Sequence, residues 1–233
     1  MIAVFRRELK ALFHGVSGYV FLSVVALFAC LFVTWFQISY GYASFEMTLS
    51  YLSIGLATVL PVLAMALFSP SKKSDGAGLL RLLPLSGKDI IAGRYLTALT
   101  MLGIVTVLLA VFPLVLSMLG PVRYLNAYLG LLGFFLLGHA LLSICLYVAS
   151  AVSNRLAAWG ISYGALIALW GIGRLAELLP QPFRSIAEIV SVFGTYTPLV
   201  FGVLDWRMIL FCLSVSAVFM LLTVRSERKK WMR

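Results

Sequence analysis

Long uncharged stretches alternate along this chain with short windows that hold nearly all of its charged residues. The hydrocarbon core of a bilayer is about 30 Å thick, so a helix needs roughly 20 apolar residues to cross it, with its backbone hydrogen-bonded internally. Six uncharged stretches approach or exceed this length. We therefore predict an all-α integral membrane protein, a single domain over 1–233, with six transmembrane helices at 19–40, 50–69, 93–119, 127–152, 156–176 and 208–225.

A seventh apolar window, at 189–204, is shorter and is interrupted by Gly194, Pro198 and Gly202. Proline and glycine both weaken a helix interior, and the window is too short for a regular span. We expect residues 178–204 to form a re-entrant or interfacial segment at the outer surface, between the fifth and sixth spans.

The basic residues are distributed unequally between the two sides that six spans define. Of the 18 Lys and Arg residues, 14 fall on the side that holds both termini and four on the other. The positive-inside rule therefore places both termini in the cytoplasm. Because these residues flank helix ends, the net charge of +10 is expected to meet anionic lipid headgroups of the bilayer, and no nucleic acid.

The segment before the first span, 1–18, has one apolar and one basic side. Its apolar residues recur at helical spacing, and the basic ones share the opposite side: Phe5, Leu9, Leu12 and Phe13 against Arg6, Arg7 and Lys10. This pattern predicts an amphipathic interfacial helix. It either anchors the first span in the correct orientation or serves as an elbow helix that also contacts a cytoplasmic partner.

The soluble segments are too short for a nucleotide-binding domain, and they contain neither a GxxxxGK[ST] nor a GxGxxG pattern. If ATP is used, another chain hydrolyses it. The eight acidic residues offer no carboxylate near the middle of a span for ion coupling, and no HExxH or GxSxG pattern is present. An enzyme is therefore the weaker functional class, and we expect no cofactor in this chain.

Polar and small residues inside the predicted spans have two interpretations. Away from the ends of these spans, His139 is the one plainly ionisable side chain, which makes it a functional candidate, but we favour a neutral imidazole hydrogen-bonded to a neighbouring helix. The cysteines, which lack ligand spacing, are interpreted as small buried hydrophobic residues: Cys30, Cys145 and Cys212. Two groups of glycines predict close helix approach: Gly130, Gly133 and Gly138, and Gly160, Gly164 and Gly171.

The order of these features resembles the permeases of the ABC-2 type transporter superfamily, and within it the gliding-motility-associated branch. The resemblance rests on LLRLLPLSGKDIIAGRYL at 79–96, on the amphipathic start with Glu8, on the run 128–164 and on the ending 205–230. It implies a multi-pass permease subunit of the bacterial cytoplasmic (inner) membrane, in an exporter or a force-transmitting complex. ATP and Mg would be bound by a separate cytoplasmic ABC ATPase subunit.

The same resemblance implies further partners, namely a second permease copy or a paralogue and an extracytoplasmic auxiliary subunit. A non-transporting membrane scaffold or sensor subunit is the alternative function. A membrane enzyme comes third.

The resemblance also implies site residues. In the cytoplasmic segment 70–90, residues 76–84 would form a coupling helix that fits a groove of the ATPase. The family usually has an acidic residue just before the leucines, and here either Asp75 replaces it or the charge is lost. The residues expected to couple to the ATPase are Phe5, Glu8, Asp75, Gly76, Leu79, Leu80, Arg81, Leu82, Leu83 and Pro84.

The second and fifth spans of such permeases face each other across a dimer axis and line the pathway. The corresponding candidates here are Thr58, Met65, Trp159, Tyr163 and Trp170. The aromatic residues among them are equally compatible with a position in the interfacial belt or facing lipid.

Overall fold

The computed structural model describes residues 2–38, 45–68, 87–118, 120–152, 154–176 and 192–231. In these ranges the chain is helical apart from short connections, and it contains no strand. The elements are α1 (Ile2–His14), α2 (Val16–Val33), the π-helix η1 (Thr34–Ile38), α3 (Phe45–Phe68), α5 (Gly87–Leu109), α6 (Phe112–Leu116), α7 (Tyr124–Ala151), α8 (Arg155–Ala176), α10 (Val192–Val200) and α11 (Trp206–Trp231).

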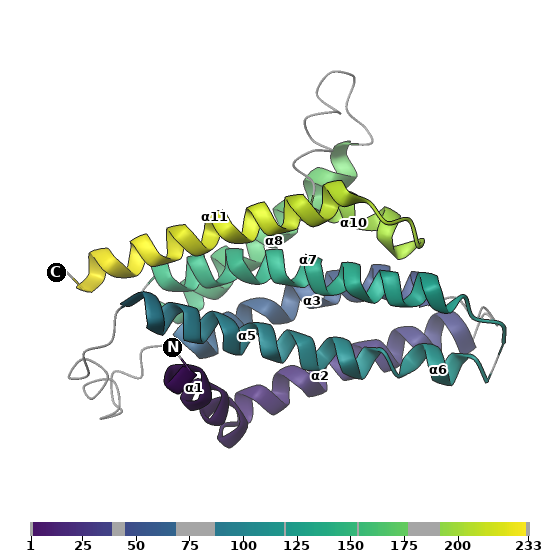
Figure 1. The fold of residues 1–233 in the computed structure, drawn as a ribbon, viewed down its shortest axis with the longest axis horizontal. Coiled ribbons are helices and arrows are strands. Elements are labelled where there is room, and N and C mark those ends of the chain that lie inside the picture. Colours follow the sequence, from purple (N-terminus) through teal and green to yellow (C-terminus); the bar gives the residue numbers. More distant parts are fainter. Residues whose placement is uncertain are drawn as a thin grey trace.

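Six stretches of helix in the described ranges are long and apolar enough to cross a membrane. They are Val16–Phe36, Phe45–Phe68, Asp89–Leu116, Tyr124–Ala151, Arg155–Gly173 and Trp206–Glu227. Figure 1 shows them running mostly along the long axis of the molecule. The prediction of six spanning helices is confirmed at this level, and the chain is a multi-pass membrane protein by length and composition.

Helix α7 forms the centre of the bundle and α8 its edge. In the most apolar window of α7, 72% of the residues are buried inside the chain, whereas in that of α8 the share is 17%. Small residues allow the central contacts: a Cβ added at Gly138 would lie 2.8 Å from Leu102 of α5 and 3.0 Å from Leu56 of α3. In the same way, Leu49 packs closely against Gly130 and Leu199 against Gly133. The predicted close approach is therefore confirmed for these three glycines.

The two ends of the bundle differ. The amphipathic helix α1 lies across the end that also holds the start of α5 and the C-terminal end of α11, as Figure 1 shows. The opposite end holds η1, α6, α10 and the start of α7. Among the described residues, the clustered basic side chains of α1 are therefore at the same end of the molecule as the basic end of α11.

Three features differ from the sequence-based expectations: the third span, Cys30 and the second group of glycines. The third span is interrupted at Ala110 and Val111, because Pro113 has no backbone N–H to continue the helical hydrogen bonding. Cys30 is not buried but exposed on the outward face of α2, whereas Cys145 and Cys212 are buried as expected. When every position of a span is apolar, its hydrophobic pattern cannot identify the face that packs inside.

The second glycine group also differs. Nothing in the chain lies within 4 Å of a Cβ added at Gly160, Gly164 or Gly171. No helix of the described chain uses this stripe of α8 for close packing, so the prediction of close helix approach there is not met within one chain.

Candidate functional site

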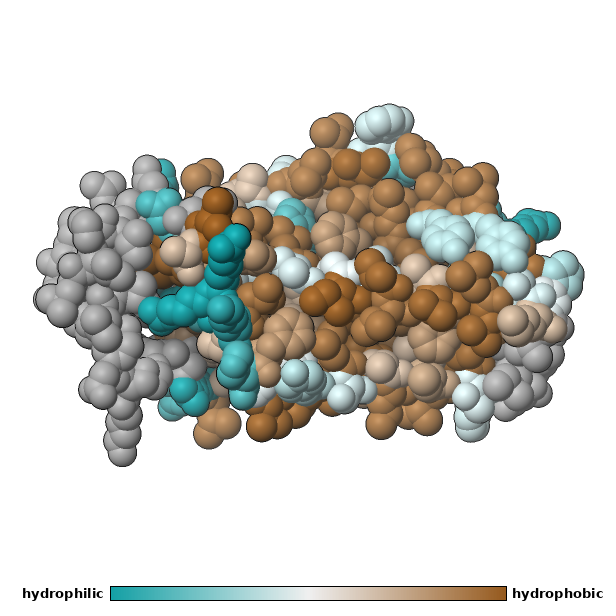
Figure 2. Space-filling model, turned by 60° about the horizontal axis from the view of Figure 1, so that its bottom comes forward, coloured by the Kyte–Doolittle hydropathy of each residue, from teal (hydrophilic) through white to brown (hydrophobic). Residues whose placement is uncertain are grey.

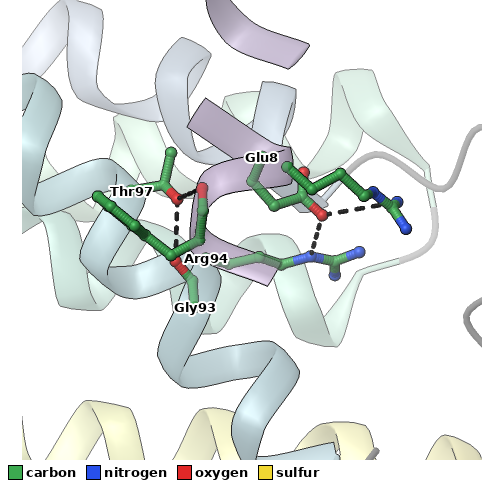
Figure 3. A network of polar contacts seen from close by, with 6 residues as sticks. Glu8, Gly93, Arg94 and Thr97 are labelled. Carbon is green, nitrogen blue, oxygen red and sulfur yellow. Dashed lines mark hydrogen bonds and ion pairs between the residues drawn. The ribbon is translucent and has the colours of Figure 1, made fainter. Parts of the chain in front are cut away.

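Helix α1 is fixed to the bundle through its packed side. Val4 and Leu12 are only 2% and 4% exposed. A Cβ added at Gly93 of α5 would lie 2.9 Å from the Cβ of Val4, so only glycine permits this approach. The hydroxyl of Thr97 donates to the Gly93 carbonyl at 2.9 Å and lies 3.5 Å from the Phe5 carbonyl (Figure 3). Backbone and side-chain contacts thus hold α1 against α5.

An ion pair reinforces this junction. Glu8 Oε1 lies 3.6 Å from Arg94 Nε and 3.8 Å from an Nη atom of Arg7, and dashed lines mark both contacts in Figure 3. The side chains of Glu8 and Arg94 are 13% and 20% exposed, but Arg7 is 48% exposed. Glu8 Oε1 and Arg94 Nε are buried and slightly too far apart for a hydrogen bond, so their attraction is that of an ion pair.

Arg94 also contacts the end of α3. Its guanidinium carbon lies 5.1 Å from the ring centroid of Phe68, which is within the range of a cation–π interaction. Arg94 therefore joins α1, α3 and α5. Phe68 is the last residue of α3 and Gly87 the first of α5, so this junction lies near the two helix ends that residues 69–86 connect in the sequence.

The predicted coupling residues fall partly in this junction. Glu8 forms its ion pair, and Phe5 contributes its carbonyl and a half-buried side chain. The other expected coupling residues lie outside the described part of the chain, namely Asp75, Gly76, Leu79, Leu80, Arg81, Leu82, Leu83 and Pro84.

The predicted lining residues lie on α3 and α8, two helices that pack against each other. On α3, Thr58 and Met65 are partly exposed, and the Thr58 hydroxyl donates to the Gly55 carbonyl of its own helix at 2.7 Å. On α8, Trp159 and Tyr163 stack with ring centroids 5.5 Å apart and planes at 4°. Trp170 packs against the core. The stacked pair lies on the same helix as the open glycines.

A buried polar cluster joins three of the spans. The hydroxyl of Tyr95 in α5 is hydrogen-bonded to His139 Nε2 in α7, and the Ser216 side chain of α11 lies beside Tyr95. The prediction that His139 bonds to a neighbouring helix is confirmed. His139 Nδ1 is buried and has no partner, so the cluster is not fully satisfied.

The opposite end of the bundle has its own polar contacts. Asn126 Nδ2 of α7 donates to Glu46 Oε1 of α3 at 3.3 Å. Gly202, with φ of 82°, lies so close to Asn126 that a Cβ would overlap its side chain. The Tyr196 hydroxyl of α10 donates to the Leu49 carbonyl at 3.4 Å. Of the segment 178–204, which the sequence predicts to be re-entrant or interfacial, the structure describes α10, packed on α3 and α7; residues 178–191 fall outside the described residues.

Sequence reasoning did not identify Arg94, Gly93 or Phe68 as parts of the site. The available signal was charge: Glu8 is the only acidic residue before Glu46, and Arg94 is the only charged residue in the predicted span 93–119. A charged residue in apolar surroundings needs a partner of opposite charge. However, 85 residues lie between Glu8 and Arg94 in the sequence, so local patterns do not reveal that the two side chains pair.

Within the described residues, no group of three or more His, Cys, Asp or Glu side chains is placed to hold a metal ion. Comparison with protein-family models gives no match for this chain, and none of the curated proteins is significantly similar to it.

Proposed function

We propose that this chain is the transmembrane permease subunit of an ABC-2 type transporter, an exporter or a force-transmitting complex of the bacterial cytoplasmic membrane. Both termini would be cytoplasmic, and a separate ATPase subunit would bind ATP and Mg. The observation that carries the proposal is the Glu8–Arg94–Phe68 junction. It fastens the crosswise helix α1 to the two helix ends between which residues 69–86 run.

This geometry can transmit a push from a partner into the membrane. A force on residues 69–86 reaches α3 at Phe68 and α5 at Gly87. Since Arg94 contacts Phe68 and pairs with Glu8, α1 is displaced together with both helices. Helices α3 and α5 pack on α7 without space for an extra methyl group at Gly138, so a tilt of one is passed to the others.

The open face of α8 supports a second permease copy or a paralogue as partner. Gly160 and Gly164, four residues apart, have empty space beside them. Small residues at this spacing allow transmembrane helices to pack closely. With a second subunit there, Trp159 and Tyr163 of α8 and Thr58 and Met65 of α3 are the residues that we propose for the pathway. An extracytoplasmic auxiliary subunit would dock at the end that holds α10.

The test is purification of the tagged full chain from its native membranes in a gentle detergent, with mass spectrometry of every protein retained in stoichiometric amount. We expect an ATPase with Walker motifs. Leu82→Glu, in the segment 70–90, should abolish its retention, whereas Arg123→Gln at the opposite end should not. Reproducible absence of an ATPase would overturn the proposal in favour of a membrane scaffold or sensor. Retention by the Leu82→Glu variant would overturn the coupling-helix assignment alone.

A further inference from the structure

The side of α1 that faces away from the bundle is basic. Arg6, Arg7 and Lys10 are all exposed. At about 100° per residue they fall within roughly a third of the helix circumference, opposite the buried Val4 and Leu12. Figure 2 shows a compact hydrophilic band on a largely hydrophobic face, near the end of the molecule at which Figure 1 places α1.

This basic side carries uncompensated charge. Glu8 is the one carboxylate of α1, and it lies toward α5, where Arg94 and Arg7 share it. Arg6 and Lys10 form no ion pair with any described residue. The surface thus offers at least two cationic groups, with Arg7 beside them.

Apolar side chains border the basic ones. Ile2 in α1 and Val16, Tyr19 and Val20 at the start of α2 are exposed. Phe5, Leu9 and Phe13 are half-buried along the edge of α1 that separates its packed side from its basic side. A soluble acidic protein would match the charges and leave this apolar border in water. A bilayer surface accommodates both, with acyl chains at the border and phosphates at the charges.

We propose that the basic side of α1, formed by Arg6, Arg7 and Lys10, binds the headgroups of anionic phospholipids and concentrates them around this helix. The proposal is independent of the ATPase partner. Each basic residue beside a membrane strengthens the attraction of its segment to an anionic bilayer surface by about fivefold, and the attraction falls off within a Debye length.

The test uses the full chain in nanodiscs. A fluorophore is attached at Ala3→Cys, on the exposed basic side, in a Cys30→Ser background. The bilayer is phosphatidylcholine with a small, equal mole fraction of spin-labelled phosphatidylglycerol or spin-labelled phosphatidylcholine. We expect the phosphatidylglycerol label to quench several-fold more strongly than the phosphatidylcholine label. The ratio should fall toward one at high salt.

Three variants decide the outcome. Arg6→Gln with Lys10→Gln should bring the quenching ratio close to one, and Arg6→Lys with Lys10→Arg should keep it. Arg123→Gln with Arg207→Gln removes two exposed charges at the opposite end and should leave it unchanged. A melting temperature equal to that of the parent chain verifies that each variant is folded. Equal quenching by both lipids in the parent chain, or an undiminished ratio in the first variant, would overturn the proposal.

Discussion

Arg94 has three roles at once, and each is open to a separate measurement. Its charge pairs with Glu8, its guanidinium lies over Phe68, and its backbone belongs to the first turns of α5. A partly buried charge that loses its partner costs more than an exposed one. The contribution of this ion pair to the free energy of unfolding is therefore expected to lie between the values for surface pairs and for fully buried pairs.

Glu8→Gln should lower the free energy of unfolding by about 1–3 kcal/mol, because Arg94 then remains partly buried without its counter-charge. Arg94→Gln should cost more, since it also removes the contact with Phe68. The double variant should be less destabilised than the sum of the two. Thermal unfolding in detergent measures this double-mutant cycle, and strictly additive losses would show that the two side chains do not interact.

A second prediction at the residue scale concerns His139. Tyr95→Phe leaves His139 Nε2 without its hydrogen bond while its Nδ1 is already unpartnered. Bonds of this kind between transmembrane helices contribute about 0.6 kcal/mol on average and up to about 1.7 kcal/mol. Tyr95→Phe should therefore destabilise the protein, and it should do so much less in a His139→Leu background. An equal loss of stability in both backgrounds would mean that the Tyr95 hydroxyl stabilises the protein through its contact with Ser216 and not through His139.

At the scale of the elements, the contact of α1 with α5 depends on Gly93, because a side chain at this position would leave no space for Val4. Gly93→Ala places a Cβ 2.9 Å from the Val4 side chain and 3.2 Å from the Phe5 nitrogen, so α1 has to shift. Overpacking of this kind costs about 1–3 kcal/mol. Gly103→Ala is the matched control in the same helix, where the nearest atom would be 4.0 Å away on Phe135.

We expect Gly93→Ala to lower the melting temperature and to weaken ATPase retention, and Gly103→Ala to leave both unchanged or to raise stability slightly, because alanine favours helix. Adding Val4→Ala to Gly93→Ala should restore part of the loss. If the two single glycine variants behaved alike, the close approach of α1 to α5 would not matter for coupling.

The elements themselves show where sequence reasoning succeeds and where it fails. The six spans are readable from hydropathy because the bilayer requires about 20 apolar residues in each. The break before α6 was not predicted, although Pro113 was visible, since Pro61 lies inside α3 without ending it. The packed face of each span was not readable either, as Cys30 shows, because the lipid and the core are both apolar. The pairing of Glu8 with Arg94 depends on the fold and has no local signal.

On the scale of the whole molecule, no other part of the described chain packs against the glycine stripe of α8, which consists of Gly160, Gly164 and Gly171. The central glycines of α7 each face a neighbouring side chain, but Gly160 and Gly164 face open space. If the second copy that we propose packs on this stripe, these positions lie near the symmetry axis. The same position in two subunits then comes close enough for a disulfide, which requires Cα atoms about 4.4–6.8 Å apart.

Gly164→Cys in a Cys30→Ser background should therefore form a disulfide-linked dimer in native membranes on mild oxidation, visible by non-reducing electrophoresis. Ala217→Cys is the matched control, because it is exposed at a comparable depth of another span, α11, where the residues four positions away on either side are the exposed Leu213 and Leu221. The remaining cysteines, Cys145 and Cys212, are buried and should not react. Preferential crosslinking at Gly164 would place α8 at the subunit interface. Equal crosslinking at both positions, or none at Gly164, would mean that this face of α8 contacts lipid and that the pathway is built elsewhere.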